Sequence, residues 1–303
     1  HFFRKHENRI VFLWLFIVSC CLVVCFTLVH HSMYGFGEEE GHWVMWPFFK
    51  DHTIYGATVA LCLPISLALL KQKGSPPLSK AILILLNVIL IIGLIFSYTR
   101  AAWLSVLCAS IIGLLVYFKV NFRFLMGLGL GFALIIYSQW DNIQLVLAKN
   151  THEHTTEAFE EKIQSAANVT TDASNLERIN RWDCAVQMFK KKPITGFGPG
   201  TYAFEYAPFQ DPQNQTIIST NFGDMGNAHS EYLGALSETG LLGLLIFISI
   251  IASIFICAIR LYYETSNQER DTKLLIMGII VSLSSYFIHA FLNNYLDTDK
   301  AAV

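Results

Sequence analysis

Charged residues are scarce in this chain of 303 residues, at 15% of the total, whereas soluble domains carry about a quarter. Hydrophobic residues make up 53%, and the mean hydropathy is +0.45. The deficit of charge is concentrated in long apolar runs, so the sequence predicts a polytopic membrane protein. The formal net charge is -2, and no basic face indicates a nucleic-acid partner.

Motifs for metal and covalent chemistry are also missing. The seven cysteines form no CxxC pair, and all but Cys184 lie inside apolar runs, where they behave as small hydrophobic residues. Neither HExxH nor GxSxG occurs, and no trio of Asp, Glu and His has the spacing of metal ligands. The sequence therefore gives little support for a metal centre or for a serine hydrolase.

Seven apolar runs are each close to the ~20 residues that a helix needs to cross a bilayer. They cover residues 10–30, 53–70, 80–98, 101–118, 122–140, 240–260 and 274–292. The predicted fold is therefore an all-α polytopic membrane protein. We expect the sequence to be a fragment of a longer chain with further spans.

Lysine and arginine are distributed unevenly over the short joints between these runs. One side of the membrane holds most of them, and only Lys50 and Arg100 lie in the opposite short joints. The positive-inside rule then places the N-terminus in the cytoplasm and residues 141–239 outside. We therefore predict transmembrane helices 1–5 in residues 1–140, a large outer loop in 141–239, and transmembrane helices 6–7 in 240–303.

The outer loop contains one clear helix signal. Ser174-Asn-Leu-Glu177 has the spacing of a capping box, and Pro193 is expected to end the helix. Gly196-Phe-Gly198-Pro-Gly200 then predicts a tight turn. Apolar residues at helical spacing predict one packed helix face, formed by Leu176, Ile179, Trp182, Val186 and Phe189.

Arginines on the predicted outer side are candidates for binding an anion. Arg100 lies between two apolar runs without an acidic neighbour, where a charge is costly unless an anion meets it. Arg178 and Arg181 are three residues apart and are therefore neighbours on a helix. Guanidinium groups match phosphate oxygens, so the three arginines favour a diphosphate site. The simpler alternatives are that Arg100 extends its charged end to the membrane surface, and that Arg178 and Arg181 are ordinary exposed residues.

His229 is the candidate general base. It lies in a segment of small residues just before an apolar run, where a tight backbone would expose the imidazole. Neutral imidazole can take a proton from an attacking hydroxyl group near neutral pH. Nearby arginines would lower the pKa of His229 and keep it neutral. A structural or merely exposed histidine is the alternative.

These residues resemble the O-antigen ligase and O-antigen polymerase superfamily of bacterial membrane glycosyltransferases. Arg100-Ala-Ala-Trp-Leu104 is similar to the R-x3-L element of that family. His229-Ser230, nine residues and Gly240-Leu-Leu-Gly243 match its H-[NSQ]-x9-G-x2-G pattern. Phe49-Lys-Asp51-His52 resembles a family Phe-x-Asp-x-Asn entry into a span, from which His52 departs. The resemblance implies a GT-C-like helical bundle with a large helical periplasmic loop, and supporting roles for Asp51, Ser230, Gly240 and Gly243.

The resemblance also implies an inverting, metal-independent transfer at the bacterial inner (cytoplasmic) membrane, with the active site facing the periplasm. The donor would be a glycan linked to a polyprenyl diphosphate such as undecaprenyl diphosphate, and Arg100, Arg178 and Arg181 would bind that diphosphate. His229 would orient or deprotonate the acceptor hydroxyl. The acceptor would be a lipid A-core sugar, in lipopolysaccharide biosynthesis, or another glycan. Membrane lipids are the other expected partners, and no cofactor is implied.

Three alternatives stay open. A polysaccharide polymerase or a protein O-oligosaccharyltransferase of the same superfamily would act on a different acceptor. Some polymerases carry an R-x15-G pattern, and neither Arg178 nor Arg181 has a glycine at that spacing, which favours a ligase. A membrane transporter fits less well, because transporters place charges or broken helices near the bilayer midplane, whereas the charges of this sequence collect at the outer rim.

Overall fold

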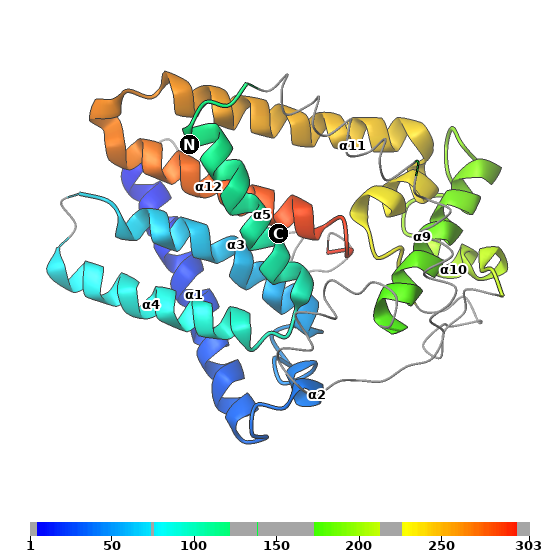
Figure 1. Ribbon diagram of the computed structural model, residues 1–303, viewed down its shortest axis with the longest axis horizontal. Coiled ribbons are helices and arrows are strands. Elements are labelled where there is room, and N and C mark those ends of the chain that lie inside the picture. The colour runs from blue at the N-terminus through cyan, green and yellow to red at the C-terminus, as the bar shows by residue number, and fades with distance from the viewer. Residues whose placement is uncertain (1–4, 74–75, 122–137, 139–172, 213–225, 296–303) are drawn as a thin grey trace. The chain divides into compact units, whose positions relative to one another are not determined.

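The computed structural model describes residues 5–73, 76–121, 138, 173–212 and 226–295. Within these residues the regular elements are helices and no strand occurs. Their order is α1 (His6–Ser32), α2 (Glu38–Gly41), α3 (His52–Leu70), α4 (Pro77–Ile95), α5 (Arg100–Tyr117), α9 (Ala173–Lys191), α10 (Tyr202–Glu205), η2 (Ala207–Phe209), α11 (Glu231–Glu264), η3 (Asn267–Glu269) and α12 (Arg270–His289) (Figure 1). The predicted all-α fold is confirmed.

In the part of the chain that the structure describes, 6 helical segments are long and apolar enough to cross a membrane. They are α1, α3, α4, α5, α11, and α12 together with η3, and each overlaps a predicted span. The prediction of a polytopic membrane protein is therefore confirmed. The predicted span at residues 122–140 lies outside the described residues, apart from Ser138.

The chain divides into two compact units. Unit 1 comprises His1–Val116, Ile251–Ala290 and Tyr295–Val303, and unit 2 comprises Tyr117–Ile250 and Phe291–Asn294. The long helix α11 therefore contributes residues 231–250 to unit 2 and residues 251–264 to unit 1. The division of the chain into residues 1–140, 141–239 and 240–303 stays a prediction.

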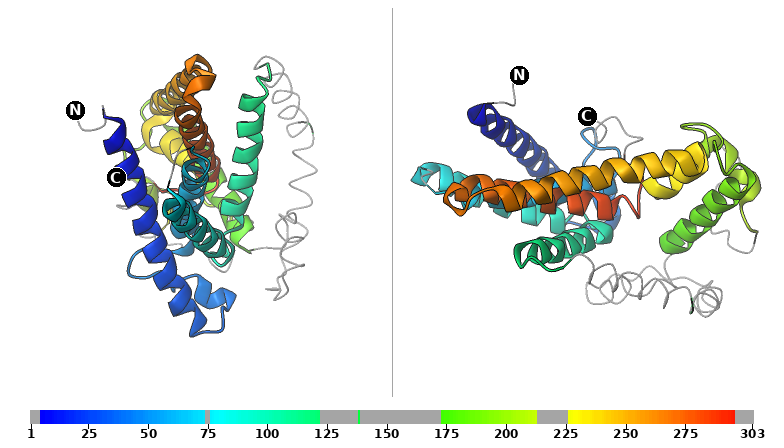
Figure 2. Two further views of the ribbon diagram at one scale, coloured as in Figure 1. Left: turned by 90° about the vertical axis from the view of Figure 1, so that its left-hand side faces the viewer. Right: turned by 90° about the horizontal axis from the view of Figure 1, so that it is seen from above.

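Helix α3 is the central helix of unit 1. It contacts α12 on one side and α4 on the other, and α1 contacts both α3 and α4 (Figures 1 and 2). Gly278 of α12 approaches α3 so closely that a Cβ atom there would lie 2.7 Å from Cβ of Ala68 and 3.1 Å from the carbonyl oxygen of Pro64. Such small residues let helices pack closely within a membrane, where the hydrophobic effect no longer drives helices together.

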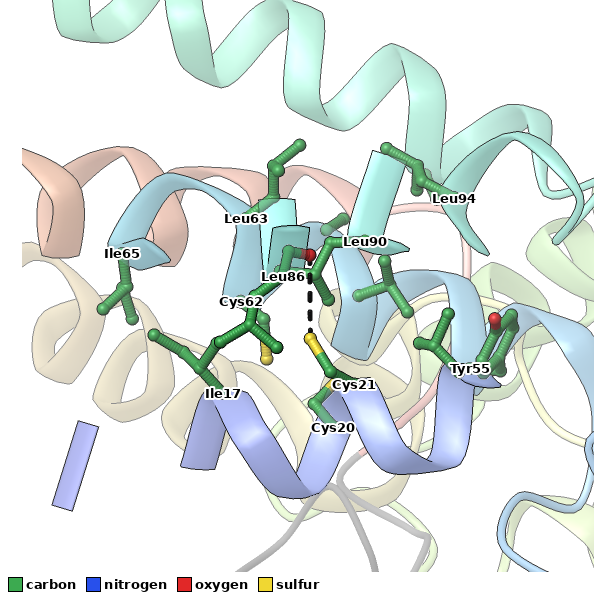
Figure 3. Packing of buried hydrophobic residues seen from close by; sticks show 14 of the residues in the cluster. Ile17, Cys20, Cys21, Tyr55, Cys62, Leu63, Ile65, Leu86, Leu90 and Leu94 are labelled. Carbon is green, nitrogen blue, oxygen red and sulfur yellow. Dashed lines mark hydrogen bonds between the residues drawn. The ribbon is translucent and has the colours of Figure 1, made fainter. Parts of the chain in front are cut away.

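The core of unit 1 lies where α1, α3 and α4 meet (Figure 3). Ile17, Cys21, Cys62, Leu86 and Leu90 are buried there against one another. The thiol of Cys21 donates a weak hydrogen bond to the carbonyl oxygen of Leu86, with a sulfur–oxygen distance of 3.7 Å. The cysteines of this core therefore pack as small hydrophobic residues, as the sequence predicts.

In unit 2, α9 packs against η2 and against residues that follow its end. The helix begins at Ala173, so Ser174 lies inside it rather than at the predicted cap, and it ends at Lys191, just before Pro193. The predicted apolar face is not its most buried face, since Ile179, Trp182, Val186 and Phe189 are only partly buried. The fully buried residues are Glu177, Asn180, Arg181, Cys184, Ala185 and Met188. The buried face therefore carries an ion pair, between Glu177 and Arg181, in place of the predicted apolar residues.

Candidate active site

The backbone around His229 is held in an unusual conformation. His229 has a φ of +47°, in the left-handed region that residues other than glycine rarely adopt. Its N–H donates to Oδ1 of Asn227 at 3.0 Å, and its carbonyl oxygen accepts from Nε1 of Trp182 at 3.3 Å. Such outliers persist where surrounding contacts fix them, and they are concentrated at functional sites. We refer to residues 226–230 as the histidine loop.

Ser230 connects the histidine loop to α11. Its side chain is buried, its oxygen accepts from the N–H of Leu233 at 3.4 Å, and the helix begins at the next residue. Ser230 is therefore the N-cap of α11. Its own N–H donates to Oδ1 of Asn294 at 2.7 Å. Ser230 therefore connects the loop both to α11 and to Asn294, and its supporting role in the reaction stays a prediction.

Arg181 is buried beneath the histidine loop. Its side chain is 4% exposed, and its Nε lies 2.6 Å from Oε1 of Glu177, one turn earlier in α9. Its Cζ lies 4.0 Å from the ring centroid of Tyr206. Gly226 has a φ of +122°, and a Cβ atom there would lie 2.8 Å from that Cζ, so a larger residue would strain the loop and displace the guanidinium. Burial alone would lower the pKa of Arg181, but the hydrogen bond and charge of Glu177 raise it above the usual value.

The environment of His229 keeps its imidazole neutral. Burial, followed by the positive charges of Arg178 and Arg181, lowers the pKa of His229 to about 4. The carboxylate of Glu177 and a side-chain hydrogen bond with Asn293 act in the opposite direction, but more weakly. The structure therefore brings His229, Arg178 and Arg181 into one electrostatic environment. At neutral pH the imidazole is free to accept a proton.

Gly240 marks a break inside α11. Its φ of +67° and ψ of -167° are not helical and are accessible essentially to glycine alone. The break turns the helix towards the chain that follows α9, and the N–H of Leu241 donates to the carbonyl oxygen of Pro193 at 2.9 Å. A Cβ atom at Gly240 would lie 2.8 Å from the nitrogen of Thr195, and still closer to the carbonyl group of Ile194. The first glycine of the motif thus shapes the helix.

The glycine-rich turn after α9 completes this junction. The N–H groups of Phe197 and Gly198 donate to the carbonyl oxygens of Ser237 and Glu238, at 3.1 and 2.8 Å. These carbonyls lie just before the break, where they have lost their partners within the helix. The carboxylate of Glu238 accepts from the N–H of Gly200 and of Tyr202, both at 2.9 Å. The predicted tight turn therefore holds the first turns of α11 through these hydrogen bonds.

Gly243 has a more local role within α11. It lies one turn after Thr239, and the Thr239 side chain occupies the space where a Cβ atom at residue 243 would be. The Thr239 hydroxyl donates to the carbonyl oxygen of Ala235 at 2.6 Å. The absence of a side chain at Gly243 therefore lets Thr239 pack along the helix next to the break.

Asp51 and Arg100 belong to unit 1, at two helix starts that are connected. Asp51 caps α3, since its Oδ1 accepts from the N–H groups of Thr53 and Ile54 at 2.8 and 3.1 Å. Thr99, just before Arg100, donates from its hydroxyl to the carbonyl oxygen of His52 at 2.9 Å. Arg100 is the first residue of α5 and is partly buried. Its convergence with His229, which belongs to unit 2, stays a prediction.

Sequence reasoning missed several polar residues of this site. Glu177 was expected to cap its own helix, whereas its carboxylate binds Arg181. Asn293 and Asn294 belong to no predicted site, although two adjacent asparagines at the end of an apolar run are a detectable signal. Glu238 is a further polar residue that sequence reasoning missed. Within the described ranges, no group of three or more His, Cys, Asp or Glu residues is placed to hold a metal ion.

The fold and the site define a polytopic helical membrane protein that holds a neutral imidazole beside two guanidinium groups, at the start of a membrane-length helix. A family model described as O-Antigen ligase matches residues 85–248, more than half of the chain, and the chain belongs to this family. None of the curated proteins is significantly similar to the chain. The predicted family is confirmed, and membership supports a role in glycan transfer with lipid-linked and glycan substrates. The match includes Arg100, Arg178, Arg181 and His229.

Proposed function

We propose that the protein transfers a glycan from a polyprenyl diphosphate to an acceptor hydroxyl, such as that of a lipid A-core sugar. The transfer inverts the anomeric carbon, needs no metal ion and takes place at the periplasmic side of the bacterial inner membrane. Family membership supports the glycan transfer. The observation that supports the mechanism is the neutral imidazole of His229 in the field of Arg178 and Arg181.

His229 acts as the general base in the proposed step. The acceptor oxygen attacks the anomeric carbon while its proton moves to the imidazole. The bond between that carbon and the diphosphate oxygen breaks, and the electron pair leaves with the diphosphate. Because the acceptor attacks opposite the leaving group, the anomeric configuration inverts. Positive charge near the diphosphate stabilises the negative charge that develops there.

The arginines have different parts in this proposal. Arg178 is only partly buried, so its guanidinium is the better candidate in unit 2 for direct contact with phosphate oxygens. Arg181 is engaged by Glu177 and Tyr206, which fits a role in holding the histidine loop and adding positive charge. Arg100 is a cation at a helix N-terminus, where the helix dipole is unfavourable to it. A bound diphosphate would offset that repulsion and also meet the N–H groups of α5.

The low pKa of His229 also has a consequence for the reaction. A base with a pKa of about 4 is weak, but this value applies to the site without substrate. A bound diphosphate would offset the charges of Arg178 and Arg181, although not the effect of burial, and would therefore raise the pKa of His229 above about 4. The base would therefore become stronger when the donor is in place. In pH profiles, the acidic limb of kcat should then lie at higher pH than that of kcat/KM.

The replacement His229→Ala tests the proposed base. We expect transfer to fall by about 10²-fold or more, the usual contribution of a general base, while the amount of protein in the membrane stays unchanged. The assay combines purified protein, polyprenyl-diphosphate-linked glycan and acceptor. His42→Ala removes an exposed histidine of unit 1 and serves as the matched control. An unchanged rate for His229→Ala would rule out the base role.

The acceptor is identified by the surface glycans of a deletion strain. A ligase leaves long glycan chains that are complete but unattached to lipid A-core. A polymerase leaves chains with a single repeat attached to the core. A protein O-oligosaccharyltransferase leaves lipopolysaccharide intact and removes glycans from periplasmic proteins. We expect the first result.

A further inference from the structure

A short segment after α12 packs against the histidine loop and its helices. Residues Phe291–Asn294 belong to unit 2, although the helix before them belongs to unit 1. The ring of Phe291 lies 5.7 Å from that of Trp182 and 5.9 Å from that of Tyr232. Trp182 is the residue whose indole N–H binds the carbonyl oxygen of His229. The segment is therefore fixed next to the loop by aromatic contacts.

Asn294 fixes this segment to the backbone of the loop. Its Oδ1 accepts from the N–H of Ser230 at 2.7 Å, and it is buried. A Cβ atom at Gly234, one turn into α11, would lie 2.9 Å from Nδ2 of Asn294, so the amide group is closely surrounded. A carboxamide that holds a backbone N–H in a buried place is a structural contact. It determines where the neighbouring residue Asn293 lies.

Asn293 contacts the imidazole itself. It is 4% exposed and hydrogen-bonds the side chain of His229. This hydrogen bond raises the pKa of His229, so it favours the protonated imidazole. Among the described residues, the charged groups that shift the pKa of the imidazole are Arg178, Arg181 and Glu177, all from α9. Asn293 contributes a dipole without a charge.

We propose that Asn293 is a positioning residue that holds the imidazole of His229 in one orientation and one tautomer. The ring nitrogen that donates to Asn293 then keeps its hydrogen, and the other ring nitrogen presents its lone pair to the acceptor hydroxyl. A neutral imidazole has two tautomers, and the hydrogen bond of one nitrogen decides which one is populated. This inference rests on the proposed base role of His229.

A neutral partner also suits the electrostatics of the site. A carboxylate in the place of Asn293 would attract the proton and raise the pKa of His229, because an opposite charge favours the charged form. A protonated imidazole cannot act as the base, so the enzyme would lose activity at mildly acidic pH. The carboxamide orients the ring at a much smaller cost in pKa. Asn293 is therefore a better partner than aspartate next to a base that must stay neutral.

The test combines the variants Asn293→Asp and Asn293→Leu with imidazole NMR. Protein labelled with ¹⁵N-histidine is titrated in lipid nanodiscs, and the signals of His229 are assigned by their loss in His229→Ala. We expect Asn293→Asp to raise the pKa of His229 by about 1 to 3. The acidic limb of the transfer rate moves up by the same amount, because the rate falls when the pH drops below the pKa of the base.

Asn293→Leu removes the acceptor and leaves a side chain of similar size. We expect kcat to fall by about 10-fold, a part of the ~10²–10⁴-fold contribution of a general base, with the KM for the donor unchanged. The NMR spectrum should then show both tautomers of His229. Asn267→Ala removes an exposed asparagine and should match the wild type in every measurement. An unchanged pKa in Asn293→Asp, or an unchanged kcat in Asn293→Leu, would overturn the inference.

The two proposals fail in different ways. If His229→Ala transfers glycan at the normal rate, the base role is wrong, and with it the use of Asn293 in the reaction. The NMR titration of Asn293→Asp would still show whether Asn293 contacts the ring. If His229→Ala is inactive while the tautomers and pKa of His229 ignore both Asn293 variants, the base role holds and only the positioning role is wrong.

Discussion

At the scale of single residues, the chain contains two similar ion pairs in different surroundings. Arg181 and Glu177 are joined at 2.6 Å through Nε and Oε1, and Arg260 and Glu264 are joined at 2.7 Å through the same atoms. Both pairs are four residues apart on a helix. The side chains of the first pair are 4% and 5% exposed, and those of the second are 76% and 58% exposed. Burial is therefore the main difference between them.

The variants Glu177→Gln and Glu264→Gln test the consequence of that burial. Glu177→Gln leaves the buried guanidinium of Arg181 without its counter-charge, and removing one partner of a buried pair costs about 3 to 5 kcal/mol. We expect a clear drop in the thermal unfolding temperature of the purified protein, together with loss of transfer as the histidine loop loosens. Glu264→Gln should leave both values unchanged. Equal effects of the two variants would show that Glu177 does not stabilise the loop.

Sequence patterns predicted the charged residues of the site but not the residues that they contact. His229 is a reactive group just before an apolar run, and Arg178 and Arg181 are neighbours on a predicted helix, so local patterns identify all three. Glu177 also stood out, but local spacing could not distinguish a helix cap from a partner one turn later. Asn293 lies far from His229 in sequence, so only folding brings the two together. Contacts of this kind cannot be derived from the pattern of one segment.

At the scale of elements, hydropathy predicted where helices lie better than which faces they bury. The predicted span at 240–260 lies inside the longer α11, which begins at Glu231 after the Ser230 cap. The extra turns belong to the site and not to the apolar run, so hydropathy could not include them. The buried face of α9 was predicted from its apolar residues, but a different face is buried. The buried face of α9 thus carries a charged pair that its apolar pattern does not predict.

The variant Gly240→Ala tests whether the break in α11 holds the site together. Alanine is strained at a φ of +67°, and its Cβ would collide with the backbone of Ile194 and Thr195. Gly35→Ala is the matched control, because Gly35 has the same φ of +67° but no atom within 4 Å of its Cβ position. We expect Gly35→Ala to cost about 1 kcal/mol of unfolding free energy, and Gly240→Ala to cost clearly more. Only Gly240→Ala should also reduce transfer.

Similar losses in the two variants would mean that the backbone angle alone matters. In that case the contact between the break and the glycine-rich turn would have no role in the site. Thermal unfolding reports the first effect and the transfer assay reports the second. Unfolding temperature and transfer rate together separate backbone strain at one residue from loss of the hydrogen bonds that Phe197 and Gly198 form with α11.

At the scale of the whole molecule, the membrane spans followed from length and apolar composition alone. All 6 described spans were predicted, because a bilayer demands long apolar helices whatever their neighbours are. The assignment of chain segments to the two units depends instead on contacts. Phe291–Asn294 joins unit 2 after a helix of unit 1, and no composition shift marks this change.

The proposed function also requires one orientation in the membrane, which cysteine labelling in intact cells can test. Glu205→Cys and Gln268→Cys place a thiol at exposed residues of α10 and η3, on opposite sides of the membrane by the positive-inside rule. A membrane-impermeant maleimide should label Glu205→Cys directly, and Gln268→Cys only after permeabilisation. The wild-type chain corrects for its own cysteines. The reverse pattern would place the histidine loop in the cytoplasm, because α10 is bonded to α9 through the Tyr202 hydroxyl and the carbonyl oxygen of Arg181, at 2.8 Å. A donor presented at the periplasmic face would then be out of reach of His229.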